Sequence, residues 1–322
     1  MRRVAALAVV PLLAAVALAG CGSSPSAKSG ASASATADTY QSVSVTGAFN
    51  KAPKVSIPKV KGTGPLLTKT LIQGSGAKLT SSEGMVGNYV AYDWSGKTSK
   101  ALGSSYSQGT PSLFAGQLLP GLEKALVGQP LGSRVLAVIP PADAFGSQGN
   151  STEGIKGTDT LVFVVDMIST FQTGSVPGTQ TSNGGGALPT VVPPKSAKAG
   201  PTIDINTKAA PPKALQVKTL IKGKGPVVKK GEDIATNYNG YIWRTGKSFQ
   251  SSWSTPNQPF TTVIGEGQVL PGWDTGLVGK TVGSRVLLVI PPKDGYGSAG
   301  SSQAGIKGTD TLVFVVDILA AS

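Results

Sequence analysis

The sequence combines a strongly basic charge with a complete absence of histidine, and both properties exclude classes of function. Among 322 residues there are 29 Lys and Arg against 16 Asp and Glu, and no His. Without His the chain lacks the usual base of hydrolase triads and the usual nitrogen ligand of zinc, so we expect no metal and no cofactor. The lysines are scattered and not interleaved with aromatic residues, which argues against a nucleic-acid partner.

The N-terminus has the pattern of an export signal. Arg2 and Arg3 precede an apolar run that is interrupted by Pro11 and is short for a membrane span. The run ends in Leu-Ala-Gly-Cys at residues 18–21, which resembles the bacterial lipobox, in which the Cys is acylated after cleavage directly before it. We therefore expect residues 1–20 to be a lipoprotein signal peptide. An ordinary secretory peptide with an incidental Cys is the alternative.

This resemblance implies a location for the protein. Cys21 would carry the lipid and anchor the chain to the membrane, at the extracytoplasmic face of the bacterial cell. Because Cys21 is the only cysteine, no internal disulfide can form and stability must come from packing. Residues 21–51 begin with a run of Ser, Ala and Gly, which favours a polar stalk between the lipid and the folded part.

The chain contains an internal repeat. The stretch GIKGTDTLVFVVD occurs at residues 154–166 and again at 305–317, and related segments precede both copies in the same order. The repeat unit is roughly 110 residues, the size of an ordinary domain. The sequence therefore predicts two related domains, at residues 52–173 and 200–322. Residues 174–199 are rich in Gly, Pro and Ser, and we expect them, with the similar residues up to 213, to be a semi-extended linker.

Within each repeat, strand patterns dominate and helix patterns are brief. RVLLVI and TLVFVVDIL are β-branched and almost continuously apolar, which is typical of buried strands. Short apolar alternations near Val55 and Ile203 predict an edge strand opening each domain. The best helix candidates, from Pro120 and Pro271, each start with Pro-Gly and end at a Gly. We predict an α+β fold in which a curved antiparallel sheet of about five strands wraps one short helix.

The second repeat resembles a known family over nearly its whole length. It contains FQSS, GQVLPGWDTGL, GSRVLLVIPPKDGYG and TDTLVFVVDIL in that order, and this series is similar to the FKBP-type peptidyl-prolyl cis-trans isomerases. The resemblance implies two FKBP-like domains, isomerase activity on X-Pro bonds, and proline-containing polypeptide clients among exported or cell-surface proteins. It also implies that macrolide immunosuppressants could act as inhibitors.

The resemblance also implies a set of site residues in the second repeat. Trp273 would form the floor under the proline ring, and the Tyr296 hydroxyl would bind a substrate carbonyl. The remaining site positions are Tyr238, Phe249, Gln250, Phe260, Val269, Leu270, Ile306 and Phe314. Gln250 stands where the family commonly has aspartate, so a hydrogen bond can survive there while the charge is lost. For Val269, Leu270 and Phe314, a role in the core alone is an equal alternative.

The first repeat departs further from the family pattern. Leu122 stands in place of the tryptophan, Phe145 in place of the carbonyl-binding tyrosine, and Leu102 with Gly103 in place of Phe249 and Gln250. The sequence is shorter near Thr110, and no counterpart of Phe260 is evident. We therefore expect the second domain to be catalytic and the first to have a degenerate pocket.

Two functions follow from these patterns. The first is a surface-anchored isomerase that assists the folding of exported proteins, working by desolvation and hydrogen bonding in an apolar pocket. The alternative is a non-catalytic peptide-binding or chaperone lipoprotein that uses both FKBP-like grooves. Trp273 and Tyr296 favour the isomerase, whereas Gln250 and the altered first repeat favour the binding protein.

Overall fold

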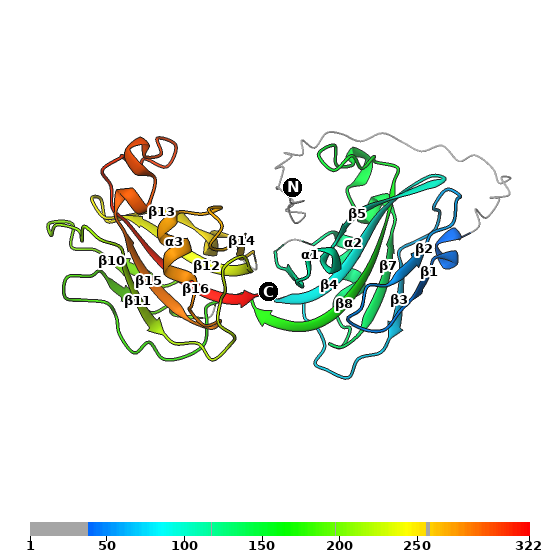
Figure 1. The fold of residues 1–322 in the computed structure, drawn as a ribbon, viewed down its shortest axis with the longest axis horizontal. Coiled ribbons are helices and arrows are strands. Elements are labelled where there is room, and N and C mark those ends of the chain that lie inside the picture. Colours follow the sequence, from blue (N-terminus) through cyan, green and yellow to red (C-terminus); the bar gives the residue numbers. More distant parts are fainter. Residues whose placement is uncertain (1–37, 117, 197, 256–257) are drawn as a thin grey trace, which may run out of the picture.

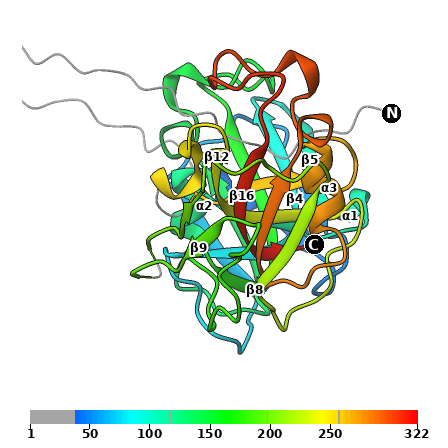
Figure 2. The same ribbon diagram turned by 90° about the vertical axis from the view of Figure 1, so that its left-hand side faces the viewer.

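The chain forms two domains that follow one another along the longest axis of the molecule (Figure 1). The computed structural model describes residues 38–116, 118–196, 198–255 and 258–322. The predicted signal peptide, Cys21 and most of the predicted stalk lie outside these described residues. In the described part of the chain, no helix is long and apolar enough to cross a bilayer. In the end-on view the second domain lies in front of the first (Figure 2).

The first domain is built on a six-stranded antiparallel sheet in the order β3-β7-β8-β4-β5, with β6 paired to β4. Its strands are β3 (Leu67–Ile72), β4 (Glu83–Ser95), β5 (Thr98–Ser104), β6 (Ser112–Phe114), β7 (Arg134–Ile139) and β8 (Thr160–Gln172). Its helices are α1 (Ser105–Gln108) and α2 (Pro120–Leu126), with 3-10 turns η1 (Thr39–Ser42), η2 (Pro141–Asp143) and η3 (Gly146–Gln148).

The second domain repeats this topology in the order β11-β15-β16-β12-β13, with β14 paired to β12. Its strands are β11 (Gln216–Ile221), β12 (Asp233–Ile242), β13 (Lys247–Ser251), β14 (Phe260–Val263), β15 (Arg285–Ile290) and β16 (Leu312–Ala321). They accompany α3 (Pro271–Leu277) and the 3-10 turns η4 (Ser252–Ser254), η5 (Pro292–Asp294) and η6 (Gly297–Ala299). The predicted fold class is confirmed, although each sheet has six strands and the first domain has the additional α1.

The two longer helices form where the sequence predicts them. Each begins at a proline, whose fixed φ suits the first helical turn and whose missing N–H would be unpaired there anyway. In each, a C-cap valine follows the last helical residue, and the next residue is a glycine in the left-handed region, Gly128 at φ 86° or Gly279 at φ 82°. Figure 1 shows each helix lying across the sheet of its own domain.

The central strands are almost wholly apolar because both faces of each sheet are covered. Along β15, Val286, Leu288 and Ile290 point toward α3 and the inner core. The alternate residues Leu287 and Val289 point to the opposite face, since successive side chains of a strand alternate. This opposite face, which we call the outer face, is buried as completely as the inner one.

A short β-hairpin covers the outer face of each sheet, and this corrects the expected stalk and linker. In the first domain β1 (Ser44–Thr46) pairs with β2 (Lys54–Ser56), and Tyr40 and Val43 pack on the sheet beside them. In the second, β9 (Thr190–Val192) pairs with β10 (Thr202–Asp204), and Val191 is fully buried. The end of the expected stalk and much of the expected linker therefore belong to the domains, because their few apolar residues cover an otherwise exposed sheet face.

A buried ion pair fastens the first hairpin to its sheet. Arg134 Nε lies 2.6 Å from Asp166 Oδ1, and Arg134 also donates to the backbone carbonyls of Gly47 at 3.0 Å and Lys51 at 2.7 Å. Asp166 in turn accepts the Asn50 N–H at 2.6 Å. The second domain has the equivalent pair, Arg285 with Asp317, at 2.7 Å.

The two domains also touch each other through a small apolar cluster. Phe171 at the end of β8 and Val176 just after it pack with Leu319 and Ala320 of β16. Leu113 of the first domain packs against the same cluster. The segment that follows β8 is therefore a packed junction at its start and not an extended tether.

Candidate active site

Trp273 stands at the centre of an aromatic cluster in the second domain. It lies in the first turn of α3, directly after Gly272, and its side chain is 4 % exposed. A Cβ at Gly272 would come within 2.7 Å of Ile290 Cγ2, so glycine lets this helix lie close to β15. The Pro-Gly sequence before Trp273 therefore sets both the start of the helix and its distance from the sheet.

Three other rings surround Trp273 edge-to-face. Its ring centroid lies 5.2 Å from that of Tyr238, 5.5 Å from Phe314 and 6.1 Å from Phe260. The interplanar angles are 87°, 88° and 90°, an arrangement that aromatic quadrupoles favour. The rings come from α3, β12, β16 and β14, so segments far apart in the sequence build one apolar wall.

These rings line a pocket of about 280 Å³. Its lining residues are Tyr238, Gln250, Phe260, Gln268, Val269, Leu270, Trp273, Tyr296 and Phe314. Two residues expected in the site lie behind the pocket wall and do not line the pocket. Phe249 packs on Phe314 with ring centroids 5.7 Å apart, and Ile306 is buried in the core. Gln268 is a lining residue that the sequence reading missed, because only loop geometry brings it to the rim.

The pocket is apolar at its base and carries hydrogen-bonding groups at its edge. Tyr296 is 37 % exposed, and its hydroxyl has no hydrogen-bond partner among the described residues. Gln250 is exposed at the same edge. Burial, with a smaller contribution from nearby Tyr296, raises the pKa of Tyr238 to about 12. The Tyr238 phenol therefore stays neutral at physiological pH, and the pocket holds no charged lining residue.

Gly240 explains how Phe249 supports the pocket from behind. A Cβ at this position of β12 would lie 2.8 Å from Phe314 Cε1 and 2.9 Å from Phe249 Cζ. Any larger residue would push the two rings apart and shift the Phe314 wall. Glycine here is thus a requirement of close packing, which the sequence alone does not reveal.

Asp274 orders the loop that carries the pocket rim. Its carboxylate accepts the backbone N–H of Gly265 at 2.6 Å and that of Gly267 at 2.8 Å. Gln268, Val269 and Leu270 follow directly. The sequence reading missed this contact, although an acidic residue just after the pocket tryptophan is a usable signal for such a loop anchor.

The equivalent region of the first domain keeps part of this arrangement. The ring centroids of Tyr89 and Phe114 are 5.8 Å apart, at an interplanar angle of 79°. The rings of Tyr238 and Phe260 have a matching arrangement, with centroids 5.7 Å apart and an angle of 79°. The expectation that Phe260 has no counterpart is therefore wrong. In the pairing of β6 with β4, the position that corresponds to Phe260 is Ser112. Phe114 lies two residues beyond it, and its ring fills the place of the Phe260 ring.

The floor of the first site nevertheless differs. Leu122 is 3 % exposed and belongs to the core, with Phe145 packed against the same cluster. Burial raises the pKa of Tyr89, and the nearby carboxylates of Asp233 and Glu153 raise it further. Asp233 belongs to the second domain, so the first site lies near the contact between domains.

The fold and the pocket define a class of protein, and the chain belongs to it: the family of FKBP-type peptidyl-prolyl cis-trans isomerases. The family's model matches residues 81–168 and 225–319, one stretch in each domain. Because both stretches match, the first domain belongs to the family as well as the second.

The chain is also similar to individual proteins. An FK506-binding protein of Streptomyces anulatus is 38 % identical over 110 residues, which are 34 % of this chain and 88 % of that protein. Peptidyl-prolyl cis-trans isomerase FKBP9 of Rattus norvegicus is 30 % identical over 204 residues, 63 % of this chain but only 29 % of that longer protein. Among solved structures, FkpA from Escherichia coli is 35 % identical with a TM-score of 0.31, over 34 % of this chain and 48 % of that chain.

Proposed function

We propose that this chain is a peptidyl-prolyl cis-trans isomerase whose catalytic pocket lies in the second domain. The observation that carries the proposal is the convergence of Trp273, Tyr238 and Phe314 under a rim with the unpaired Tyr296 hydroxyl. Rotation about an X-Pro bond crosses a barrier of about 18–20 kcal/mol without breaking a bond. The reaction therefore requires no nucleophile, and an apolar enclosure with one placed donor is suited to it.

The pocket acts through differences between the planar amide and its twisted transition state. The planar form places negative charge on the carbonyl oxygen and is stabilised by water, so an apolar pocket disfavours it. The twisted form has lost this resonance and suffers less from desolvation. Trp273 supports the proline ring, and the Tyr296 hydroxyl donates to a substrate carbonyl. An acceleration of about a thousandfold needs only about 4 kcal/mol.

The test is an exchange measurement on a proline tetrapeptide, by NMR or with a coupled protease. We expect the double variant Trp273→Leu with Tyr296→Phe to lower kcat/KM by about 100-fold, because it removes the stacking surface and one hydrogen bond. The matched control is Phe145→Leu, which changes the residue aligned with Tyr296 in the first domain and should leave the rate unchanged. A double variant as fast as the parent would place the chemistry elsewhere.

The same measurement distinguishes the isomerase from the alternative, a non-catalytic binding protein. Leu122 and Phe145 in the first domain and the neutral Gln250 in the second are the features that favour a pure binding protein. In that case the parent chain binds proline peptides, but their cis-trans exchange is no faster with the protein than in buffer alone. The Streptomyces relative is named an FK506-binding protein. We further propose that macrolides compete with substrate for the Trp273 pocket of this chain.

We also propose that the protein is a lipoprotein, anchored through Cys21 at the extracytoplasmic face of a bacterial membrane. The support is the lipobox-like sequence at residues 18–21 after an apolar run led by two arginines. Its clients would then be exported or cell-surface polypeptides that contain proline. Folding steps limited by X-Pro isomerisation take tens to hundreds of seconds, which is the interval such an enzyme shortens.

A further inference from the structure

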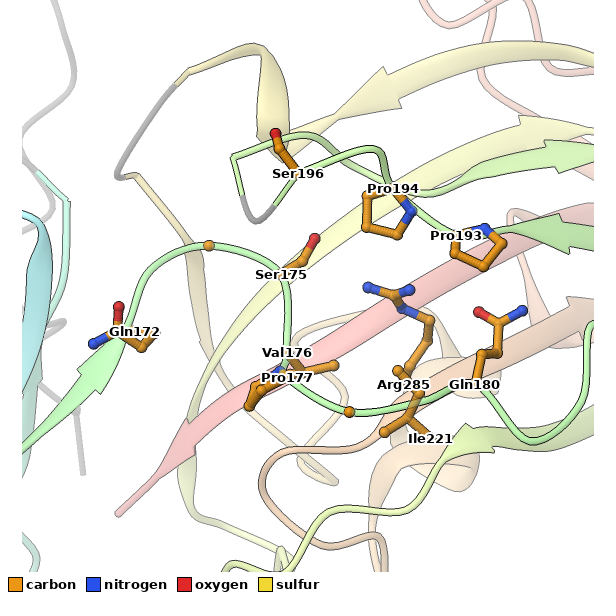
Figure 3. A pocket seen from close by; sticks show the side chains of 12 residues that line it. Gln172, Ser175, Val176, Pro177, Gln180, Pro193, Pro194, Ser196, Ile221 and Arg285 are labelled. Carbon is orange, nitrogen blue, oxygen red and sulfur yellow. The ribbon is translucent and has the colours of Figure 1, made fainter.

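A second pocket lies on the outer face of the second domain, on the side of the sheet opposite Trp273. Its volume is about 440 Å³, and Figure 3 shows it between the segment after β8, the Pro193–Pro194 turn and the sheet. Arg285 begins β15 and shares the face of Leu287 and Val289, whereas Val286 and Leu288 face the aromatic pocket. The two pockets are therefore separate.

Arg285 brings an unused hydrogen-bond donor to this pocket. Its side chain is only 2 % exposed, and its Nε and Nη2 donate to the two carboxylate oxygens of Asp317, each at 2.7 Å. In the described part of the chain, Nη1 has no acceptor. Figure 3 shows the guanidinium directed toward the turn that carries Pro193 and Pro194.

Gln180 brings an unused acceptor to the same pocket. Its Nε2 donates to Asn183 Oδ1 at 2.7 Å and to the Val191 carbonyl at 2.9 Å. Its Oε1 is buried and accepts no hydrogen bond among the described residues. A buried acceptor without a donor is costly, and native structures contain few of them. Figure 3 shows Gln180 beside the Arg285 side chain.

The first domain shows what such an arginine binds. Arg134 occupies the position of Arg285 and forms the same pair, with Asp166. Its Nη1 donates to the Gly47 carbonyl at 3.0 Å and its Nη2 to the Lys51 carbonyl at 2.7 Å. There the chain's own backbone lies over the arginine. In the second domain Val176 N–H reaches Asp317 at 3.0 Å, but no carbonyl of the described residues reaches Arg285.

We propose that this outer pocket binds a short polypeptide segment through its backbone. One carbonyl of the segment accepts from Arg285 Nη1, and one N–H donates to Gln180 Oε1. Asp317 balances the arginine charge, so the site suits a neutral amide and not an anion. Val176, Pro177 and Ile221 add apolar contact. This gives the second domain a polypeptide-binding site that is independent of its proline pocket.

The test uses the full chain and the peptide acetyl-GAFNKA-amide, which copies residues 47–52 and contains no proline. In an NMR titration we expect saturable shifts of the Val176, Gly178 and Gln180 amides. Gln180→Leu should weaken binding at least about fivefold by removing the acceptor. Ser196→Trp, at the exposed rim, should abolish it by filling the pocket. Retained amide shifts in β11 and β15 establish that both variants are folded.

Two control variants localise the effect. Thr179→Leu introduces the same side chain at the exposed neighbouring position and should bind the peptide like the parent, as should Trp273→Leu. Gln180→Leu should keep the parent isomerase rate. No saturable shift up to about 10 mM peptide would overturn the proposal. So would unchanged affinity in both pocket variants, shifts confined to the Trp273 pocket, or equal shifts of these amides by acetate or phosphate.

Discussion

Tyr238 links the pocket of the second domain to pH. It is 6 % exposed, and burial is the main cause that raises its pKa from 10.0 to about 12. An unfolded tyrosine loses its proton near pH 10, so between pH 10 and 12 the folded state holds a proton that the unfolded state has released. The stability from this group is complete below pH 10 and is lost as pH rises to 12.

We therefore predict that Tyr238→Phe flattens the alkaline stability profile. The parent's free energy of unfolding should fall more steeply than the variant's between pH 10 and 12, as measured by urea denaturation. At pH 7 the two profiles should be parallel in their pH dependence, which serves as the internal control. Equal slopes in the alkaline range would mean that Tyr238 is not buried in the folded protein.

The chain contains no His, so we predict that the isomerase activity does not change with pH between about pH 6 and 9.

The covering hairpins are the elements that differ most from the sequence-based prediction, because a stalk and a linker were expected in their place. In the second domain Val191 of β9 packs against Leu287, Val289 and Val313 on the outer face of the sheet. Without the hairpin these buried side chains would meet water. The sequence of this region is rich in Gly, Pro and Ser, yet Val191 with Ile203 and Ile205 buries enough apolar surface to hold it on the sheet, because hydrophobic burial scales with the area covered.

We predict that Val191→Ala destabilises the second domain by about 1–3 kcal/mol, through the lost contact and the cavity left behind. Val192 is the matched control, since it is adjacent in sequence but 48 % exposed. Val192→Ala should change the free energy of unfolding by no more than about 0.5 kcal/mol. Urea denaturation monitored by tryptophan fluorescence measures both. Equal effects of the two substitutions would indicate that β9 is not docked on the sheet.

For the whole molecule, the position of the hairpins sets where the chain can be divided. The first domain includes the segment from Tyr40 onward, and the second begins directly after β8. A cut after β9, within residues 193–199, would remove this strand from the sheet that it covers. The two domains should therefore separate best close to residue 174, and not within the Gly- and Pro-rich stretch that follows.

We predict that fragment 174–322 is more stable than fragment 200–322, because only the longer one keeps β9 paired with β10. We also predict that fragment 174–322 isomerises a proline tetrapeptide at least about 100-fold faster than fragment 38–173. The reason is that Trp273 and Tyr296 are replaced by Leu122 and Phe145. Circular dichroism melting and the exchange assay supply the measurements. Similar activity of both fragments would assign catalysis to features that the two pockets share, such as the Tyr–Phe pair.

Membrane attachment also belongs to the scale of the whole molecule. If Cys21 carries the lipid, Cys21→Ser should prevent the incorporation of labelled palmitate and release the protein from the membrane fraction. A serine substitution elsewhere in the same region, Gly22→Ser, should leave both unchanged. Continued membrane association of the Cys21→Ser protein would show that the chain is held there in another way.

The sequence by itself determined the repeat, the central strands of each sheet and the helix that starts at Pro120 or Pro271 in each domain. The resemblance to the family, carried by motifs of contiguous residues, also predicted most of the residues that line the pocket around Trp273. Tertiary structure alone decided that Phe114 replaces Phe260, that Asp274 anchors the rim loop, and that Gly- and Pro-rich segments cover the outer faces. These features depend on contacts between residues far apart in the chain, where a few buried apolar side chains or one shifted ring decide the packing. No local pattern encodes such pairings.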